Sequence, residues 1–356
     1  MFSELLVADA DHIVKMPCID WNYLKNANVL ITGATGLIGS SLVRAIAAGC
    51  IHYDTGTKVK LLVRNQDRAK AQYEKLIKGN IVELITGALE DLPYDEMGDI
   101  DYIIHCAGIT DSQTMNDRPV DIIDNLVCGT KAVLDLAICK GAKRFIYISS
   151  IEVYGETESG ECLEDNLGQI DLTNPRNSYP ESKRMAEMMC YSYNKQYGLS
   201  VAVARLASTL TPFVSETDKR LTSYLINCMI SGQDIVLNTS GEKCRSFVYI
   251  IDADTAILTI LTSGAIATFN VANKDAFTSI IGLANITAKM SDKPMCVRIN
   301  QSQREQDVSK YNSCAVLNMN SSRLESLGWS AHYGLEQMLK GIGDYYKAAT
   351  KNDLQS

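Results

Sequence analysis

The sequence predicts an α/β protein built on a doubly wound parallel sheet, with a smaller C-terminal lobe. Short runs rich in Val and Ile alternate with amphipathic stretches at helical spacing over roughly the first 200 residues, and this alternation is typical of βαβ units in a parallel sheet. After Arg205 the pattern changes to shorter, mixed elements. The change indicates a second, smaller lobe.

The expected elements follow one another in the order that this fold requires. We expect strands at 28–32, 58–63, 81–86, 100–105, 143–149 and 200–205, with helices between them at 37–48, 66–78, 119–139 and 180–197. In the second lobe we expect helices at 219–230, 252–263, 278–290 and 334–348 and strands at 244–250 and 267–271. Residues 1–26 are expected to form a helical extension whose Trp21 packs on the body.

Composition limits the partners of the chain. Its 356 residues are enough for one large domain or two ordinary ones. Hydrophobic residues make up 46% and charged residues 21%, and the net charge of -8 comes from acids spread along the chain. No Lys/Arg-rich run interleaved with aromatic residues is present, and such runs are what grip nucleic acid. We therefore expect no nucleic-acid partner.

The cysteines and the N-terminus indicate a cytoplasmic protein. The eleven cysteines are odd in number, scattered, and never spaced C-x-x-C, so they are interpreted as small hydrophobes in a reducing compartment. With only four histidines, no metal site is expected. The N-terminus lacks a positive segment followed by an apolar stretch, and no apolar run approaches the ~18 residues that cross a bilayer. We therefore expect no signal peptide and no membrane span.

A glycine-rich turn indicates a dinucleotide site. The stretch VLITGATGLIGS follows the first expected strand, opens the first helix, and has G-x-x-G-x-x-G spacing. This spacing allows a tight turn, a close approach of backbone to a pyrophosphate and close helix–strand packing, with amides and the helix dipole directed at the phosphates. We therefore expect a Rossmann dinucleotide-binding fold. The expected contacts are Gly33, Thr35, Gly36, Leu37, Ile38 and Gly39.

The choice between NAD and NADP stays open at Arg64. An acidic residue is expected at the end of the second strand to hold the adenine-ribose hydroxyls, but KVKLLVRNQ offers Val63 and Arg64 there. Arg64 is compatible with a contact to a 2′-phosphate, with stacking on the adenine, or with a solvent-facing position. NAD is the expected cofactor, with NADP as the alternative that Arg64 permits.

Tyr179 and Lys183 form a candidate catalytic pair. They lie four residues apart at the start of an expected helix and therefore share one face. Removing a hydride from an alcohol requires a base, and a tyrosine must have its ordinary pKa of about 10 lowered by roughly 3 units to act near neutral pH. The Lys183 ammonium would supply part of that shift. An isolated Y-x-x-x-K would indicate a surface pair, but this one follows a dinucleotide turn and a Ser-Ser at a strand end.

These motifs resemble the extended short-chain dehydrogenase/reductases, and within them the NAD-dependent nucleotide-sugar epimerase/dehydratase family. The resemblance covers almost the whole chain. It rests on TGATGLIG (32–39), DYIIHCAG (101–108), NLVCGTKAVLDLA (125–137), FIYISSIEVYG (145–155), SYPESK (178–183), CRSFVYIID (244–252), FNVANK (269–274) and LESLGW (324–329). It implies an enzyme that oxidises a nucleoside-diphosphate sugar at C4 with tightly held NAD.

The resemblance also implies a role for each matching residue. Ser150 would hydrogen-bond the sugar C4 hydroxyl, Tyr179 would remove its proton, and Lys183 would also hold the nicotinamide ribose. Arg245 would contact the substrate diphosphate, or would be a surface ion-pair residue.

Two further residues and the division of the chain follow from the same likeness. Ala107 would contact the cofactor, and Asn125 would hold the active-site scaffold or cap a neighbouring element. The chain would comprise an N-terminal helical extension (1–26), a dinucleotide-binding domain (27–206, joined by parts of 244–272) and a substrate-binding lobe (207–356).

Glu152 suggests chemistry beyond C4. In the 4,6-dehydratases of this family the catalytic Ser/Thr is followed by Asp-Glu, which act as acid at C6 and base at C5, and in UDP-glucuronate decarboxylases a Ser-Glu pair fills these places. Here the sequence reads Ser150-Ile151-Glu152. Glu152 thus matches the residue for C5 chemistry, whereas Ile151 cannot supply a proton. The plainer interpretation of Glu152 is a solvated or backbone-capping carboxylate.

The chain departs from the family pattern at the nucleotide. Ala88 stands where an Asp is usual, and RLASTLTP (205–212) replaces R-x-x-N-x-Y-G-P, with Ser208, Leu210 and Thr211 at the altered positions. Recognition of the substrate phosphates must therefore be rebuilt. The expected phosphate partners are Lys219, Arg220 and Arg245.

Three activities fit these residues. The first is C4 oxidation followed by C5 chemistry through Glu152, as in a dehydratase or decarboxylase. The second is plain 4-epimerisation, and the third is reduction of a ketosugar by NADPH, which Arg64 would favour. A non-catalytic relative would be expected to lose Tyr179 or Lys183, and both are present. The resemblance also implies a homodimer, formed through the helices near 119–139 and 180–197.

Overall fold

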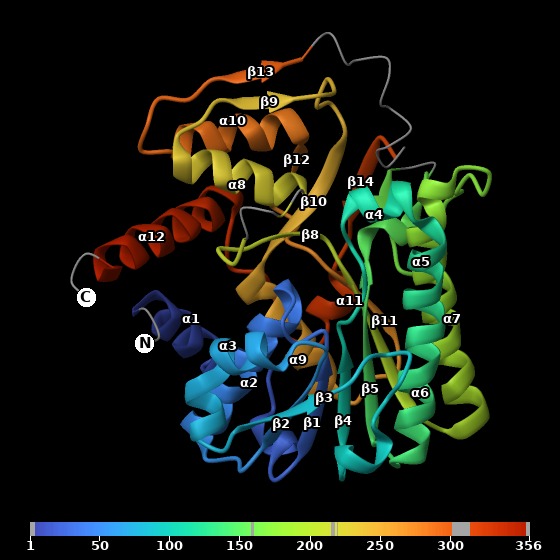
Figure 1. Cartoon of the computed structure of the whole chain (residues 1–356). Helices are drawn as coiled ribbons and strands as arrows, with labels where there is room; N and C mark the ends of the chain where they lie inside the picture. The colour runs from blue at the N-terminus through green and yellow to red at the C-terminus, as the bar shows by residue number, and fades with distance from the viewer. Residues whose placement is uncertain (1–3, 158–159, 215–217, 219, 301–313, 354–356) are drawn as a thin grey trace.

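The central sheet consists of seven parallel strands. A computed structural model describes residues 4–157, 160–214, 218, 220–300 and 314–353. The strands lie in the order β11-β7-β5-β4-β1-β2-β3 (Figure 1). They are β1 (Asn28–Thr32), β2 (Lys58–Val63), β3 (Val82–Thr86), β4 (Tyr102–His105), β5 (Arg144–Ser150), β7 (Ser200–Leu206) and β11 (Thr268–Val271). This arrangement confirms the predicted fold class.

Helices cover both faces of this sheet. Successive strand residues face opposite sides, so that Val29 and Ile31 pack into one core and Leu30 into the other. One face carries α2 (Leu37–Tyr53), α3 (Gln66–Lys78) and α9 (Ile250–Ser263), and the other carries α6 (Gly129–Cys139) and α7 (Ser178–Tyr197). Because both faces are covered, the strands are apolar almost throughout.

The sheet topology places a crevice above β1 and β4. From β1 the chain builds the sheet outward to β2 and β3, and it then returns to the other side of β1 to form β4. Loops that leave two such neighbouring strands diverge at their carboxyl ends, and ligands bind in the crevice between them. The glycine-rich turn leaves β1 and residues 106–111 leave β4, so the predicted cofactor turn lies at this position.

The smaller lobe combines two sheets with several helices in the described part of the chain, and it forms the upper part of the molecule in Figure 1. One sheet has the order β12-β10-β14-β6, with β8 paired beside β10, and the other pairs β13 with β9. Its strands are β6 (Glu161–Cys162), β8 (Ser208–Leu210), β9 (Ile235–Leu237), β10 (Cys244–Tyr249), β12 (Phe277–Ser279), β13 (Val297–Ile299) and β14 (Val316–Met319). The helices are α8 (Leu221–Ser231), α10 (Ile280–Met290) and α12 (Leu335–Asp353).

The N-terminal segment packs on the body. Helix α1 (Glu4–Val14) lies against α2, α9 and α12. Trp21, in the short helix η1 (Trp21–Leu24), is buried against Gly49 of α2. A Cβ atom at Gly49 would lie 1.9 Å from the Trp21 ring, so only glycine admits the indole there. The predicted packing of Trp21 is confirmed.

The predicted helix at 119–139 is interrupted. It consists of α5 (Pro119–Ile123), a π-helical turn η3 (Asp124–Cys128) and α6. Several short elements were not predicted, among them β6, β8 and β9, and the helices α4 (Ser112–Asp117) and α11 (Ser322–Glu325). These segments have only two to six residues, too few to display a hydrophobic period. No helix in the described part of the chain is long and apolar enough to span a membrane.

Candidate active site

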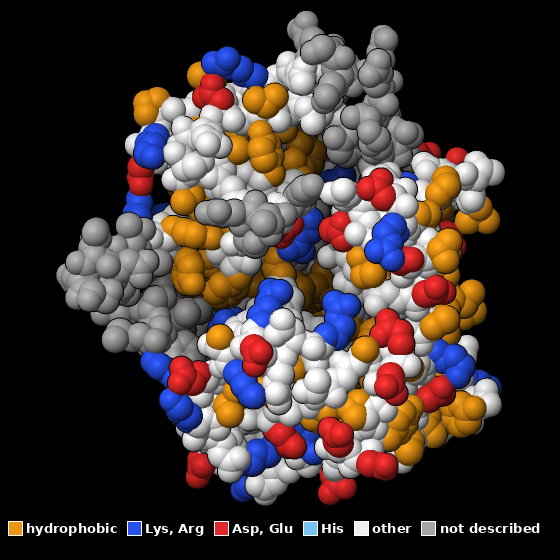
Figure 2. All heavy atoms as spheres, in the orientation of Figure 1, with side chains coloured by type: hydrophobic (Ala, Val, Ile, Leu, Met, Phe, Trp, Pro, Cys, Tyr) orange, Lys and Arg blue, Asp and Glu red, His pale blue; other side chains and the backbone are white. Residues whose placement is uncertain are grey.

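A cleft of about 1810 Å³ separates the carboxyl edge of the sheet from the smaller lobe. Its walls include the glycine-rich turn, the end of β5, the start of α7, and residues of α8 and β10. Figure 2 shows the hollow between the two parts of the molecule, with Lys and Arg side chains beside it. The cleft therefore joins the expected cofactor turn to the expected catalytic residues.

The glycine-rich turn has the shape that a dinucleotide requires. Gly33 adopts a φ of 67°, and a Cβ atom there would lie 2.6 Å from the Ala107 amide nitrogen. A Cβ on Gly39 would lie 2.4 Å from the Gly33 carbonyl oxygen, so side chains at either position would separate the turn from β4 and α2. Gly36, which precedes the first turn of α2, lines the cleft. Backbone amides at this helix N-terminus are thus available to a pyrophosphate.

The other expected cofactor contacts differ in position. Leu37 and Ile38 line the cleft with the three glycines. Thr35, Arg64 and Ala107 are not among the described residues that line it. Arg64 is exposed at the end of β2. An exposed side chain at this point is compatible with each of the three expected roles, namely a contact to a 2′-phosphate, stacking on the adenine and a solvent-facing position.

Ser150, Tyr179 and Lys183 lie together on the wall of the cleft. Ser150 ends β5, and its side chain favours the ionised form of Tyr179. Lys183 donates to the Ile148 carbonyl oxygen at 2.8 Å, and its ammonium lies 6.0 Å from the centre of the Tyr179 ring. One turn of α7 therefore brings Tyr179 and Lys183 to the same strand end.

The pKa of Tyr179 is raised rather than lowered. Burial and the negative charge of Glu152 raise it to about 12, although the Ser150 hydrogen bond and the charges of Arg176 and Arg220 act in the opposite direction. Burial also lowers the pKa of Lys183 to about 8. The expected lowering of the tyrosine pKa by Lys183 is therefore absent in the free protein, because desolvation of the phenolate outweighs the nearby cations.

Glu152 forms a two-point ion pair with Arg176. The distances are 2.5 Å from Nη1 to Oε2 and 3.1 Å from Nη2 to Oε1. Both side chains line the cleft, Arg176 is buried, and Glu152 retains 16% of its side-chain exposure. Burial lowers the pKa of Arg176, but the Glu152 carboxylate outweighs this effect and raises it. Glu152 is thus fixed at the cleft wall by a guanidinium that grips both oxygens.

Sequence reasoning missed Arg176, although a signal was available. Pro175-Arg176 lies three residues before Tyr179, in the short helix η5 (Pro175–Asn177) that leads into α7. An arginine three residues before Tyr179 could have been considered as a partner for Glu152, the other charged residue expected at the site. The pairing itself depends on tertiary structure.

The residues expected to contact the substrate phosphates differ in how available they are to an anionic ligand. Arg245 lines the cleft and donates no hydrogen bond to any described side chain or carbonyl group, and its Nε is buried without a partner. Arg220 also lines the cleft but is held by both oxygens of Asp218. Lys219 lies outside the described residues. Arg245 is therefore the cation most available to an anionic ligand in the described part of the site.

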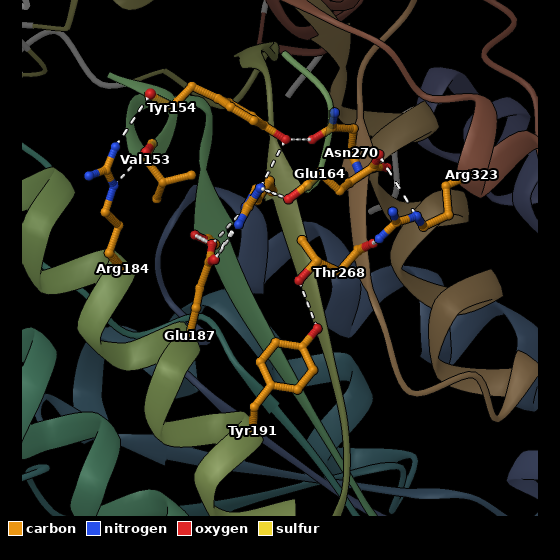
Figure 3. A network of polar contacts seen from close by, with 11 residues as sticks. Val153, Tyr154, Glu164, Arg184, Glu187, Tyr191, Thr268, Asn270 and Arg323 are labelled. Carbon is orange, nitrogen blue, oxygen red and sulfur yellow. Dashed lines mark hydrogen bonds and ion pairs between the residues drawn. The ribbon is translucent and has the colours of Figure 1, made fainter. Parts of the chain in front are cut away.

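A buried polar network holds the loop that carries Ser150 and Glu152. Ser149, next to Ser150, donates to Glu187 at 2.5 Å, and Glu187 pairs with buried Arg205 at 2.7 Å. Arg205 donates to the Tyr154 hydroxyl at 3.0 Å. In Figure 3, Arg184 and Glu187 reach from α7 toward the segment of Val153 and Tyr154, while Tyr154 contacts Asn270 of β11. The network thus fixes both ends of the short helix η4 (Ile151–Tyr154), which contains Glu152.

Asn125 supports the opposite wall. It lies in the π-helical turn, and its side-chain oxygen accepts a hydrogen bond from the Ile109 amide at 3.0 Å. This contact holds the loop after β4, where Gly108 and Thr110 line the cleft. The extra residue of a π-helical turn turns Asn125 toward that loop.

Comparisons with known proteins identify relatives of this chain. The chain is 30% identical over 262 residues to UDP-glucuronic acid decarboxylase 1 of Xenopus tropicalis, which covers 74% of this chain and 60% of that protein. It is 26% identical over 330 residues to UDP-glucuronic acid decarboxylase 6 of Arabidopsis thaliana, which covers 89% and 88%. The chain therefore spans about 60% of the length of the first of these relatives.

Solved structures show the same fold. UDP-glucuronic acid 4-epimerase from Bacillus cereus, in complex with UDP-glucuronic acid and NAD, has a TM-score of 0.76 at 22% identity, covering 90% of this chain and 99% of that one. UDP-glucose 4-epimerase from Thermotoga maritima has a TM-score of 0.73 at 20% identity, covering 91% and 99%. The sequence also matches the NAD dependent epimerase/dehydratase family over residues 29–272. The family match spans the cofactor turn, the Ser150–Tyr179–Lys183 wall and strand β11, and the chain belongs to the NAD-dependent epimerase/dehydratase family.

Proposed function

We propose that this enzyme oxidises a nucleoside-diphosphate hexuronic acid at C4 and then releases the carboxylate as CO2. The observation that carries the proposal is the pairing of Glu152 with Arg176 beside Ser150 and Tyr179, close to the unpartnered Arg245. The similarity to UDP-glucuronic acid decarboxylases supports the same substrate class.

The first step uses the Ser150–Tyr179–Lys183 wall. Tyr179 takes the proton of the C4 hydroxyl, and Ser150, which lines the cleft beside Tyr179, holds that hydroxyl by a hydrogen bond. Lys183, buried and fixed to the Ile148 carbonyl oxygen, keeps a cation one helical turn from the tyrosine. Bound NAD, held at the glycine-rich turn, supplies the hydride acceptor for C4 oxidation.

The second step follows from the position of the ketone. A C4 ketone makes the C5 carboxylate a β-keto acid, so the C5–C6 bond breaks and its electron pair enters the C4–C5 enolate. CO2 leaves, and a proton then adds at C5. Return of the hydride to C4 would then give the pentose and restore NAD. We assign the handling of this proton to Glu152, which lines the cleft next to Ser150 and is held in one orientation by Arg176.

The charges at this wall suit an anionic sugar. Arg176 contacts the Glu152 carboxylate, and Arg245 lines the same cleft, where the charges of Glu152 and Arg176 both act on it. The local charge is therefore positive before a substrate enters. A 4,6-dehydratase would instead require an acid at position 151, and Ile151 is a buried hydrocarbon with 4% exposure.

Two alternative activities use the same site. The first shares the oxidation at C4, and the second shares only Tyr179 and Lys183. A 4-epimerase requires no group at C5, since the ketosugar only rotates and is reduced again. An NADPH-dependent ketosugar reductase would use Tyr179 and Lys183 but release its cofactor in each turnover, and exposed Arg64 is the feature that favours it.

The test uses purified enzyme with UDP-, dTDP-, GDP- and CDP-sugars and the corresponding uronic acids, in deuterated water. We expect the protein to carry bound NAD and to release CO2 from a uronic acid, with deuterium at C5 that is lost in Glu152→Gln. Clean C4 inversion without C5 deuterium would identify an epimerase. An empty cofactor site with NADPH-dependent turnover would identify a reductase.

Tyr179→Phe tests the first step separately. We expect turnover to fall by about 10²–10⁴-fold while the NAD content of the purified protein is unchanged, because only the hydroxyl is removed. Tyr197→Phe, on the exposed end of the same helix, is the matched control. Loss of NAD in Tyr179→Phe would instead assign this tyrosine to cofactor binding.

We further propose that the enzyme is a homodimer formed through α5 and α7. Val120 and Ile123 of α5 and Met185 and Met188 of α7 are exposed hydrophobic residues, and α5 packs on α7. Leu134 of α6, by contrast, faces the core with no exposure. The apolar surface therefore lies on α5 and the first half of α7.

A further inference from the structure

We propose that His12, Asp252 and His332 form a binding site for a divalent transition-metal ion, best matched by Zn²⁺, that fastens α1 to the body of the protein. One ligand atom of each residue lies within 4.8 Å of the other two. The three residues come from α1, from α9 and from the loop that follows Trp329, so an ion between them would join segments far apart in sequence.

The two imidazole rings present suitable donor atoms. Nδ1 of His332 lies 2.9 Å from the Ser330 carbonyl oxygen. The same nitrogen lies 4.0 Å from Oδ1 of Asp252, so a metal ion between the ring and the carboxylate would take the place of the Ser330 contact. Nε2 of His12 is buried and has no hydrogen-bond partner among the described residues. A buried imidazole nitrogen without a partner is costly, and a metal ion would remove that cost.

The carboxylate of Asp252 is already fixed in place. It is fully buried, and its two oxygens accept hydrogen bonds from the backbone amides of His332 at 3.0 Å and Tyr333 at 3.2 Å. Each oxygen has a second lone pair available for a metal. These bonds hold Asp252 and the loop of His332 together before any ion binds, and a divalent ion would compensate the buried negative charge.

The donor set selects the type of metal. Two imidazoles and one carboxylate suit Zn²⁺, whereas Mg²⁺ and Ca²⁺ prefer oxygen ligands throughout. If the three donor atoms are 4.8 Å apart, the centre of their triangle lies about 2.8 Å from each of them. Bonds from Zn²⁺ to these ligands are about 2.0–2.2 Å long, so each donor atom would have to move inward by less than about 1 Å. His332 retains 42% exposure, which leaves a water molecule access to the fourth position.

The ion would act on the N-terminal extension rather than on catalysis. The His12 ring lies edge-on against His332 at 4.8 Å and against Tyr333 at 5.6 Å, so α1 is positioned at the site already. Helix α9, which contains Asp252, is also joined to α2 by a hydrogen bond from Ser41 to Asp254. Helix α2 begins at the glycine-rich turn. The proposal revises the expectation of no metal site, which rested on the number of histidines and not on their proximity.

The test is Zn²⁺ binding to the full-length, tag-free protein after treatment with a chelator. We expect one Zn²⁺ per chain by titration calorimetry, a rise in melting temperature, and slower proteolysis within residues 4–14. His12→Gln and His332→Gln should each weaken binding at least about 10-fold. His52→Gln, on α2 outside the cluster, should leave binding unchanged, and Mg²⁺ should produce no rise in melting temperature.

The absorption spectrum of the Co²⁺ form tests which residues bind. Histidine and carboxylate ligands give no cobalt–thiolate charge-transfer band, whereas the exposed cysteines 128, 139 and 296 would give one. A thiolate band, unchanged affinity in both histidine variants, or no binding by the wild-type protein would overturn the proposal.

Discussion

At the scale of single residues, the site depends on which charges surround one phenol. Burial and the Glu152 charge raise the pKa of Tyr179 to about 12 in the free protein. A tyrosine acts as a base only when it is deprotonated, so the rate of C4 oxidation should rise with pH as the tyrosinate forms. Every group that shifts this pKa therefore shifts the pH at which the first step becomes fast.

This dependence predicts the effect of removing the Glu152 charge. Because Glu152 raises the pKa of Tyr179, Glu152→Gln should lower that pKa and move the rising limb of the pH–rate profile to lower pH. The measurement is the single-turnover rate of C4 oxidation against pH. Glu181→Gln, which removes a charge from the Arg184 pair on the same helix, should leave the limb in place. A limb that stays fixed or moves to higher pH in Glu152→Gln would contradict this account.

Single residues also show where sequence reasoning reached its limit. Ser150, Tyr179 and Lys183 could be predicted because their spacing reports a strand end and one helix face. Arg176 could not, because its role depends on η5 bringing it back to Glu152, and no local period encodes that approach. The raised pKa of Tyr179 was likewise missed, since the degree of burial depends on the whole cleft.

At the scale of elements, the glycine-rich turn must combine an unusual backbone conformation with close packing. Gly33 and Gly141 have similar positive φ values of 67° and 63°, but a Cβ on Gly141 would meet nothing within 4 Å. Alanine substitutions at these two positions therefore distinguish the cost of backbone strain, which both share, from the cost of a steric clash, which only Gly33→Ala adds.

We expect Gly141→Ala to lower the free energy of unfolding by about 1 kcal/mol, which is the cost of the left-handed conformation. Gly33→Ala should cost clearly more and should also lower the NAD content, because its Cβ would lie 2.6 Å from the Ala107 nitrogen. Chemical denaturation and cofactor analysis measure the two effects. Equal destabilisation of the two variants, with NAD retained in both, would show that the turn tolerates a side chain.

The network behind the catalytic loop should be costly to break. Glu187 and Arg205 form a buried pair, so Glu187→Gln should lower the free energy of unfolding by about 3–5 kcal/mol. Glu74→Gln, which breaks the exposed pair with Lys78, should cost no more than about 1 kcal/mol. Urea unfolding of both variants tests the contrast. A similar small effect in both would mean that the network does not hold the loop.

Element prediction succeeded where the hydrophobic period was long. The strands at 28–32 and 58–63 and the helix at 66–78 agree with the structure at both ends. The π-helical turn at Asp124–Cys128 was hidden, because one extra residue per turn does not disturb an apolar pattern enough to be recognised. The short strands of the smaller lobe are defined by pairing between distant segments, such as β9 with β13, and their sequences alone carry little signal.

At the scale of the whole molecule, the proposed dimer surface can be separated from the rest of the exposed apolar residues by single charges. Met188→Glu places a charge at a position with 64% exposure on the proposed dimer surface, whereas Ile51→Glu does so at 63% exposure on α2. We expect the first variant to be monomeric and the second to remain dimeric, because a charge buried without a partner opposes association. Sedimentation velocity distinguishes these outcomes, and a dimeric Met188→Glu would exclude this surface.

The central claim is that C4 oxidation in this enzyme leads to loss of the C5 carboxylate. The most direct measurement is a turnover with a nucleoside-diphosphate hexuronic acid labelled with ¹³C at that carboxylate, followed by NMR in deuterated water. We predict that the label leaves as CO2 and bicarbonate and that the product pentose carries deuterium at C5. Retention of the label in a sugar inverted at C4, or in the unchanged substrate, would contradict the claim.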